Sequence, residues 1–270
     1  MKVYVFDFDD TLAHTEGTIG ISHFEHGESL DPYEWLDELG VSRSYIMYSR
    51  RYPSCNAVYV NSAGFREYVS AVKSHGGVHA REIGTETGVG VEDVLDFSHI
   101  NDLESAKPLQ GMVEIARLAS ARGDIVGVVT GRKGGGFVMG LDGRRHPVTT
   151  RQEIHRFLSG LGVIIDPEDI HGVGHMPGTV ASNKKRVILA EFIEKYEPDE
   201  TIFYDDDNQN LDEVSSLSSQ HPVVVHDAKI VKEQATPWLT GIVERAKLRR
   251  RETDSWARAR RMVGKGGRVV

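Results

Sequence analysis

The sequence predicts an α/β fold in which a parallel sheet carries helices on both faces, in three α/β/α layers. Three observations lead to this prediction. A nearly unbroken run of β-branched and aromatic residues, "KVYVFDF", spans residues 2–8 and is typical of a central strand. Helix and strand patterns alternate regularly after residue 106. Between these parts, residues 13–100 have an irregular pattern, which indicates an α+β insertion after the first strand.

The composition suits a soluble protein with one large domain. The chain has 270 residues, of which 39% are apolar and 27% charged, and no apolar run approaches the roughly 18 residues that a membrane span needs. The first apolar stretch is broken at Asp7 and does not have the pattern of a secretory signal. The single cysteine, Cys55, excludes an internal disulfide framework and fits a reducing compartment. We therefore expect a cytoplasmic protein with no membrane partner.

The C-terminal segment differs from the rest of the chain in charge. Residues 244–270 contain ten Arg or Lys against three acids, a net +7 that leaves −15 for the remainder. One interpretation is a solubilised terminal helix. The other is a basic arm that contacts nucleic-acid phosphates or an acidic partner, with Trp256 as an anchor.

Two segments of the insertion have regular patterns. "DPYEWLDELG" predicts a short helix that ends at Gly40, and "NAVYVNSAGFREYVSAVKSHGG" predicts a strand and then a helix with Phe65, Val69 and Val72 on one face. "GTETGVGVEDV" predicts a loop. We expect the insertion to cover another part of the molecule. Its aromatic side chains either pack inside it or offer a base-stacking surface; these are Trp35, Tyr45, Tyr48 and Tyr52.

Residues 1–12 and 101–243 supply the expected core domain. Helices are predicted at "GMVEIARLASARG", "TTRQEIHRFLSGLG", "SNKKRVILAEFIEKY" and "NLDEVSSLSS". Further strands are predicted at "DIVGVVT", "DETIFYDDD" and "PVVVHD". The turn "GRKGGG" lacks the spacing of a phosphate-binding P-loop, and we expect it to be a flexible loop or short lid at the rim of a site.

Three predicted strands end in polar residues that can carry chemistry. These are Asp7, Asp9, Asp10 and Thr11 after the first, Thr130, Gly131 and Arg132 after the second, and Asp205, Asp206 and Asp207 after the third. Ligands of open α/β sheets bind beyond the carboxyl ends of the strands. Lys184 and Lys185 begin a predicted helix, where a cation opposes the helix dipole unless an anion lies nearby. We expect these groups to meet in one site.

Carboxylates on two neighbouring loops suit Mg²⁺, which binds one or two carboxylates, waters and a substrate phosphate. A lysine can offset the remaining charge and bind the phosphate as a point charge. One aspartate can attack phosphorus, and a second, two residues later, can protonate the leaving oxygen and then activate water. The Thr130 hydroxyl can donate to a phosphoryl oxygen. The pattern predicts Mg²⁺-dependent phosphoryl transfer.

Four segments resemble the motifs of one family. "VYVFDFDDTL" resembles the first motif of the haloacid dehalogenase-like (HAD) superfamily, an apolar strand followed by DxDxT. "VVTGR", "NKKRV" and "IFYDDDNQN" resemble its second, third and fourth motifs, in family order. The resemblance implies a Rossmann-like core and a Mg²⁺-dependent phosphatase or phosphotransferase. Because a carboxylate stands two residues after the nucleophile, phosphatase activity is favoured.

The resemblance also implies roles for the acids. Asp7 is the nucleophile and Asp9 the general acid and base. Asp7, the backbone carbonyl of Asp9 and Asp206 are the expected Mg²⁺ ligands, with Asp205 as the competing ligand. We prefer Asp206 because Asn210, four residues later, matches a family position that is often acidic or amide.

The remaining motif residues are expected to contact the substrate. Lys184 fits the third motif slightly better than Lys185, because Val187 and Ile188 then point inward. Thr130 and Lys184 complete the expected catalytic set. The expected substrate-binding residues are Thr11, Gly131, Arg132 and Lys185.

A narrower resemblance bears on the substrate. "VLDFSHINDLESAKPLQGMVEIARLA", "VVTGR" and "TIFYDDDNQNLDEV" resemble a HAD branch common in bacteriophages, in which case the cytoplasm is that of the host. "VTGR" and "NKKRVI" are similar to the phosphatase domain of phage polynucleotide kinases. The expected partner is thus a phosphorylated small molecule or a nucleic-acid end, reached in the second case with help from the basic segment. The rival interpretation is a binding or structural protein that keeps the fold without the reaction.

Some of these residues have a structural interpretation beside the functional one. Arg132 fits a solvated loop charge as well as a substrate contact. Asp10 fits a turn and Asp207 a helix cap. His171 and His175 could bind a metal, but no acid or thiol accompanies them.

Overall fold

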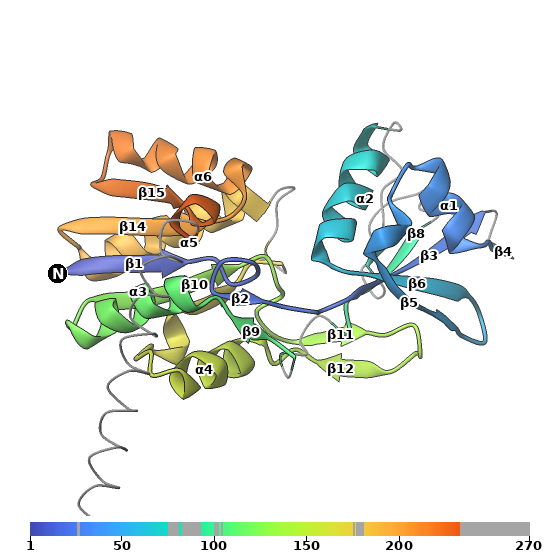
Figure 1. The fold of residues 1–270 in the computed structure, drawn as a ribbon, viewed down its shortest axis with the longest axis horizontal. Helices are drawn as coiled ribbons and strands as arrows, with labels where there is room; N and C mark the ends of the chain where they lie inside the picture. Colours follow the sequence, from blue (N-terminus) through green and yellow to red (C-terminus); the bar gives the residue numbers. More distant parts are fainter. Residues whose placement is uncertain are drawn as a thin grey trace, which may run out of the picture.

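The structure is a computed structural model that describes residues 1–25, 28–74, 81–82, 93–99, 103, 105–174, 176 and 181–232. These residues form a five-stranded sheet and a separate six-stranded sheet, which lie one after the other along the longest axis of the molecule (Figure 1). The basic segment 244–270 and His175 lie outside the described residues. So does the predicted loop at 84–94, except that Asp93 and Val94 begin a strand.

The five-stranded sheet is parallel throughout and has the order β13-β10-β1-β14-β15. The strands are β1 (Lys2–Phe6), β10 (Ile125–Thr130), β13 (Ile170–Gly172), β14 (Glu200–Asp205) and β15 (Val223–Asp227). The central position of β1 and the α/β class with a parallel sheet are confirmed. The edge strand β13 was not predicted, because three residues are too few to show a periodic pattern.

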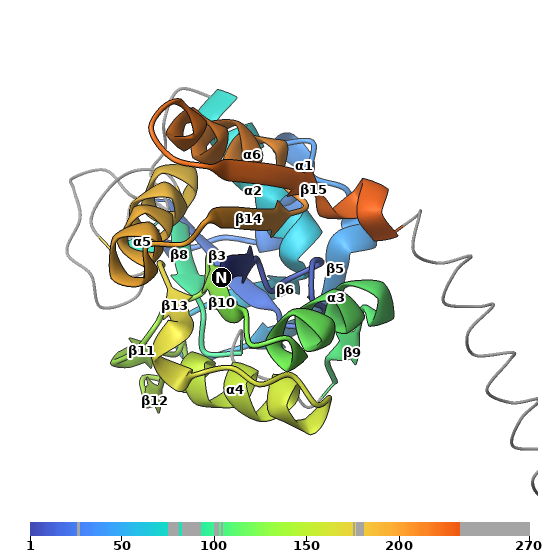
Figure 2. The ribbon, with the colours of Figure 1, turned by 90° about the vertical axis from the view of Figure 1, so that its left-hand side faces the viewer.

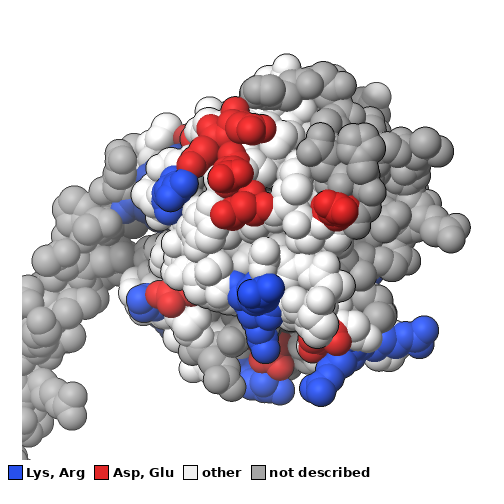
Figure 3. All heavy atoms as spheres, turned by 90° about the vertical axis from the view of Figure 1, so that its right-hand side faces the viewer, with Lys and Arg blue, Asp and Glu red and all other residues white. Residues whose placement is uncertain are grey.

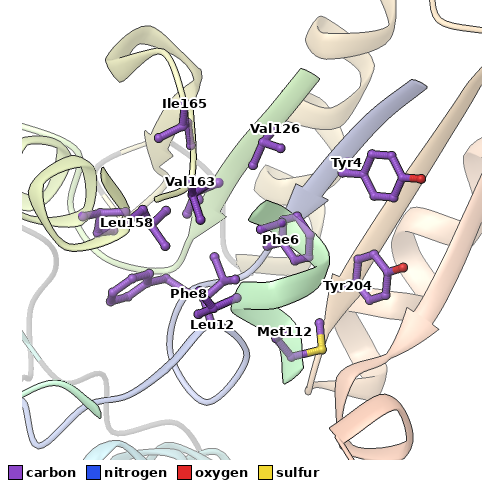
Figure 4. Close-up of a cluster of buried hydrophobic side chains, with 14 of the residues drawn as sticks. Tyr4, Phe6, Phe8, Leu12, Met112, Val126, Leu158, Val163, Ile165 and Tyr204 are labelled. Carbon is purple, nitrogen blue, oxygen red and sulfur yellow. The ribbon is translucent and has the colours of Figure 1, made fainter. Parts of the chain in front are cut away.

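Helices cover both faces of this sheet (Figure 2). They are α3 (Gln110–Ala121), α4 (Thr150–Gly160), α5 (Ala181–Tyr196) and α6 (Asn208–Ser215). Alternation along β1 directs Tyr4 and Phe6 into the cluster with α3 and α4, and Val3 and Val5 into the cluster with α5 and α6. Figure 4 shows Tyr4 and Phe6 packed beside Met112 of α3 and Tyr204 of β14, with Leu158 of α4 in the same cluster.

Two glycines permit this packing. Gly127 in β10 has no side chain where a Cβ atom would lie 2.5 Å from the ring of Phe192 of α5, so the helix can approach the sheet closely. Gly123 lies two residues after the end of α3 and has φ +80°, a left-handed backbone conformation that favours glycine after a helix. Among the described helices, none is long and apolar enough to cross a membrane.

The second sheet belongs to the insertion. Its main path is β5-β6-β3-β8-β7, and β4 pairs with β3. The strands are β3 (Ile19–Glu25), β4 (Glu28–Ser29), β5 (Ile46–Arg51), β6 (Asn56–Val60), β7 (Arg81–Glu82) and β8 (Asp93–Asp96). The helices α1 (Pro32–Glu38) and α2 (Ser62–Ser74), both predicted, cover one face, and Phe65, Val69 and Val72 of α2 pack into the same apolar cluster as predicted.

Two short ribbons connect the sheets. Strand β2 (Ala13–His14) leaves the core and pairs with β9 (Lys107–Pro108), which returns to it. After "GRKGGG", β11 (Phe137–Met139) and β12 (Arg145–Pro147) form a hairpin that reaches from the core to the insertion (Figure 1). There Leu141 packs against the cluster of Tyr52 and Tyr59, and its backbone N–H donates to Asp96 at 3.3 Å.

Candidate active site

A cavity of about 290 Å³ lies where the insertion covers the carboxyl ends of β1, β10 and β14. The core lines it with the acidic residues that follow β1 and β14, with Gly131 and Arg132 after β10, and with Lys185 of α5. The insertion contributes Gly17, Ile19, Ser62, Phe65, Arg66 and Phe97. The expectation that the insertion covers another part of the molecule is therefore confirmed, and the covered part is this cavity.

Three buried carboxylates meet at one side of the cavity. One oxygen from each of Asp7, Asp205 and Asp206 lies within 4.8 Å of the others. Lys185, with its side chain 4% exposed, donates to Asp7 Oδ1 at 2.7 Å and to Asp205 Oδ2 at 2.8 Å. Burial lowers the pKa of Lys185, but Asp7 and Asp205 outweigh that effect and raise it above its ordinary value. The lysine is therefore a fixed positive charge between two acids.

The preference for Lys184 over Lys185 is wrong, because Lys185 is the lysine that lies in the site. Lys184 is half-buried on α5 and forms no ion pair with any described residue, whereas Lys185 contacts the acids directly. The expected inward position of Val187 is also wrong, since Val187 is 40% exposed. Ile188 does point inward. The helix lies rotated on the sheet relative to the expectation, so the next residue along the chain faces Asp7.

Asp205 and Asp206 differ in their hydrogen bonds. Asp205 is fully buried and accepts from Lys185, from the backbone N–H of Asp207 at 2.9 Å and from Asn210 Nδ2 at 3.0 Å. Asn210, whose position was the reason for preferring Asp206, donates its amide to both oxygens of Asp205. Asp206 is buried and accepts no hydrogen bond from a described residue. Asp206 is thus the acid of the three that is left to another partner.

The acids carry more negative charge than Lys185 can balance. Burial raises the pKa of Asp7 well above its ordinary value, although Lys185 opposes this. Burial, and then repulsion by Asp205, raise the pKa of Asp206. Three carboxylates against one ammonium leave two uncompensated charges when all are ionised, and the donor set consists of hard oxygens. These residues fit a divalent cation such as Mg²⁺.

Asp9 lines the same cavity and is paired with Arg132. The guanidinium donates to Asp9 through Nε at 2.9 Å and through a terminal nitrogen at 2.6 Å, and the Thr15 hydroxyl donates at 2.6 Å. Burial pushes the pKa of Asp9 upward, but Arg132 and then Thr15 outweigh it and hold the pKa below its ordinary value. Arg132 is 3% exposed, so its interpretation as a solvated loop charge is wrong.

The two predicted threonines lie behind the cavity surface. The Thr130 hydroxyl donates to Asp9 at 3.3 Å and accepts from the backbone N–H of Arg132 at 3.3 Å, so in this arrangement it serves those two residues. Thr11 is fully buried, is absent from the cavity lining and has no hydrogen-bond partner for its hydroxyl among the described residues. This position does not support a substrate contact for Thr11. Gly131 lines the cavity as expected.

Sequence reasoning missed the contribution of the insertion. Arg66 of α2 reaches over the cavity to within 3.8 Å of Asp10 and 4.0 Å of Asp206, and its side chain is 50% exposed. Phe65 and Phe97 form an apolar wall, with ring centroids 5.6 Å apart at 87°. The helical pattern of α2 places Phe65 on a buried face, but no local signal marks Arg66 or Phe97.

The structural interpretations of several residues are confirmed. Asp207 caps α6 by accepting from the N–H of Gln209 at 2.8 Å. Asp10 has φ +56° in the turn after β1. Among the aromatic residues of the insertion, Trp35 stacks on His23 at 4.2 Å, and the Tyr52 hydroxyl contacts that of Tyr59.

The fold therefore brings Asp7, Asp205 and Asp206 together with Lys185, and places the Asp9–Arg132 pair beside them. No family model matches the chain, and no curated protein matches it either.

Proposed function

We propose that this chain is a Mg²⁺-dependent phosphomonoester hydrolase of the HAD type that acts through an aspartyl-phosphate on Asp7. The observation that carries the proposal is the contact of Lys185 with both Asp7 and Asp205, beside an Asp206 that has no hydrogen-bond donor of its own. A nucleophilic carboxylate, a fixed cation and an acid left free for a metal are the parts that phosphoryl transfer needs.

Asp7 and Asp206 are the residues that would hold Mg²⁺. Asp205 is less suited, because donors from Lys185, Asn210 and the backbone already occupy its oxygens. Bound Mg²⁺ would neutralise the charge of the acids and of the phosphoryl oxygens. Lys185 would hold the second oxygen of Asp7 in place and add a positive charge beside the phosphoryl group.

The reaction has two displacements on phosphorus. An oxygen of Asp7 forms a bond to phosphorus while the bond to the leaving oxygen breaks, and Asp9 gives its proton to that oxygen. Water then attacks the phosphorus of the aspartyl-phosphate and gives a proton to Asp9, which releases inorganic phosphate and restores Asp7. Asp9 must therefore hold a proton in the first half and accept one in the second.

Arg132 controls whether Asp9 holds a proton. While it pairs with Asp9, the acid is ionised and can only accept a proton. A substrate phosphoryl group at the adjacent cavity surface competes for the same guanidinium, because Arg forms bidentate bonds with phosphate as well as with carboxylate. Departure of Arg132 toward the phosphoryl group would leave the burial of Asp9 less opposed, so the pKa of Asp9 would rise and favour the protonated form that can donate.

The test is the release of inorganic phosphate from a panel of phosphomonoesters with Mg²⁺ and with EDTA. The panel contains nucleotides, sugar phosphates, and oligonucleotides phosphorylated at the 3′ or 5′ end. We expect Mg²⁺-dependent release that Asp7→Asn abolishes while its circular dichroism spectrum stays that of the wild type. Asp212→Asn, which removes an exposed acid of α6, serves as the matched control. Equal release by Asp7→Asn would refute the mechanism. A folded wild type that releases no phosphate from any member would favour a binding protein.

A further inference from the structure

Arginine side chains in the described part of the chain divide into two groups. Eight lie within 4.0 Å of a carboxylate: Arg43, Arg66, Arg117, Arg122, Arg132, Arg151, Arg156 and Arg186. Four exposed arginines have no described carboxylate partner: Arg50, Arg51, Arg144 and Arg145. In a chain with a net charge of −8, acids are abundant, so a group of unpaired arginines marks a surface of unusual charge.

These four arginines lie at two hairpin tips that contact each other. Arg50 and Arg51 end β5 at the tip of the β5–β6 hairpin, and Arg144 and Arg145 lie at the tip of the β11–β12 hairpin. Leu141 joins the tips, because it packs in the cluster that contains Tyr52 and Cys55. Figure 3 looks onto this end of the molecule, where Lys and Arg side chains lie in the middle and lower part with some Asp or Glu side chains among them, and a larger acidic group lies in the upper part. Arg51 follows Arg50 directly in β5 and so points to the other face of the sheet, and we therefore call Arg50, Arg144 and Arg145 the arginine tips.

Asp142 lies in the same turn as Arg144, interacts with it electrostatically and offsets part of the charge of the tips. Asp142 accepts from the backbone N–H of Arg144 at 3.0 Å and contacts His146 at 3.2 Å, so it is used within its own turn. Arg50 instead lies over the ring of Tyr52, with its guanidinium carbon 5.3 Å from the ring centroid. The guanidinium groups therefore keep their donors available to a partner from solution.

We propose that the arginine tips bind the phosphate backbone of single-stranded nucleic acid. Guanidinium groups recognise phosphate through paired hydrogen bonds, and several on one surface match a repeating anion. Tyr48 supports a single strand over a duplex. Its ring is 41% exposed, stacks on the buried Tyr59 at 4.5 Å and 15°, and shares the Tyr59 side of the sheet with Arg50 by alternation along β5. A held aromatic ring of this kind accepts an unpaired base.

The hairpin also links this surface to the cavity. Arg132 lines the cavity, and β11 begins five residues later with Phe137, which is 60% exposed. The hairpin thus runs from the cavity to the arginine tips, with an exposed ring between them. Binding at the tips does not depend on the proposed hydrolysis, and it should persist in Asp7→Asn.

The test is fluorescence anisotropy of a labelled 12-nucleotide single-stranded DNA without terminal phosphates, titrated with the full chain at several salt concentrations. The triple variant Arg50→Ala/Arg144→Ala/Arg145→Ala should bind the DNA more weakly at 0.1 M salt, by roughly fivefold for each arginine removed. The slope of log Kd against log salt concentration should be smaller by about 2 than that of the wild type. The matched control removes the same charge from paired arginines, as Arg117→Ala/Arg151→Ala/Arg156→Ala. Its affinity should stay within about twofold of the wild type.

The basic C-terminal segment is present in every variant, so a difference between the two triple variants belongs to the tips. The proposal is overturned if both variants weaken binding equally, if neither does, or if the wild type does not bind the DNA. It is also overturned if a duplex of the same sequence binds as tightly or if poly-glutamate competes as well as DNA. The unfolding temperatures of both variants are measured beside the titrations. The variant Arg50→Lys/Arg144→Lys/Arg145→Lys should bind more tightly than the triple Ala variant, because it restores the positive charge.

Discussion

Arg132 and Asp9 form a two-point ion pair in which both carboxylate oxygens of Asp9 accept from one guanidinium, at 2.9 and 2.6 Å. The arginine follows β10 and the acid follows β1, so neighbouring strands of the sheet place them opposite each other. The pair holds Asp9 ionised, because the pKa of Asp9 lies below its ordinary value. The proposed acid and base therefore has a partner that the substrate must displace.

We expect Arg132→Met to reduce phosphate release by at least about a hundredfold, because the variant lacks the guanidinium proposed to bind the phosphoryl group. The variant should also change stability against pH. With Arg132 present, the lowered folded pKa of Asp9 adds stability above its unfolded pKa, about 3.9, and this is lost as the pH falls through the folded pKa. Thermal unfolding followed from neutral to acidic pH should show a smaller acid loss in the variant. An equal fall of the unfolding temperature at acidic pH in the wild type and in Arg132→Met would contradict this account. Arg156→Met is the control and should behave as the wild type does.

The uncompensated charge at Asp206 predicts an effect of metal removal. The folded pKa of Asp206 is raised, so its ionisation costs stability as the pH rises from about 3.9 through the raised value. In EDTA at neutral pH, Asp206→Asn should therefore unfold about 2–4 °C above the wild type, a change of about 1 kcal/mol in a chain of this size. Mg²⁺ should raise the unfolding temperature of the wild type but not of the variant. Asp212→Asn should respond to Mg²⁺ as the wild type does, and an unchanged Mg²⁺ response in Asp206→Asn would exclude it as a ligand.

The two adjacent lysines of α5 predict a sharp contrast. Lys185→Met leaves Asp7 and Asp205 buried without their cation and should cost about 3–5 kcal/mol of unfolding free energy, with loss of phosphate release. Lys184→Met removes the same charge from a half-buried position without an ion pair and should change stability by less than about 0.5 kcal/mol. Urea unfolding and phosphate release measure both. Equal losses in the two variants would mean that the lysine position does not matter.

Arg66 predicts that the insertion contributes to substrate binding. Arg66→Ala removes a half-exposed guanidinium at the cavity mouth, whose ion pairs of 3.8 and 4.0 Å are too long to be strong. We expect KM to rise about tenfold while kcat changes little, because from the cavity mouth the group would contact the bound substrate and not the reacting atoms. Steady-state kinetics with the best substrate of the panel checks this. A fall in kcat at constant KM would place Arg66 in the chemical step instead.

Much of the fold could be predicted because its signals are local. The apolar run of β1, the helical spacing of Met112, Ile115 and Ala119 in α3, and the acids after β14 are each readable within about ten residues. Except for β6, which "NAVYV" predicted, the strands of the insertion and the β11–β12 hairpin were not predicted. They are short or interrupted, as at the register shift between Ile46 and Tyr48, and their burial depends on partners far away in the chain.

The sequence alone determined that acids follow two strands of a parallel sheet, and the rules of α/β folds place such residues at one edge. Only the tertiary structure decided that Lys185 and not Lys184 meets Asp7, since a helix can be rotated by one residue without changing its local pattern. It also decided that Arg132 pairs with Asp9, and that Arg66 of the insertion lies beside Asp206 at the cavity. These contacts join residues more than a hundred positions apart, and their geometry follows from packing between elements, which no local pattern records.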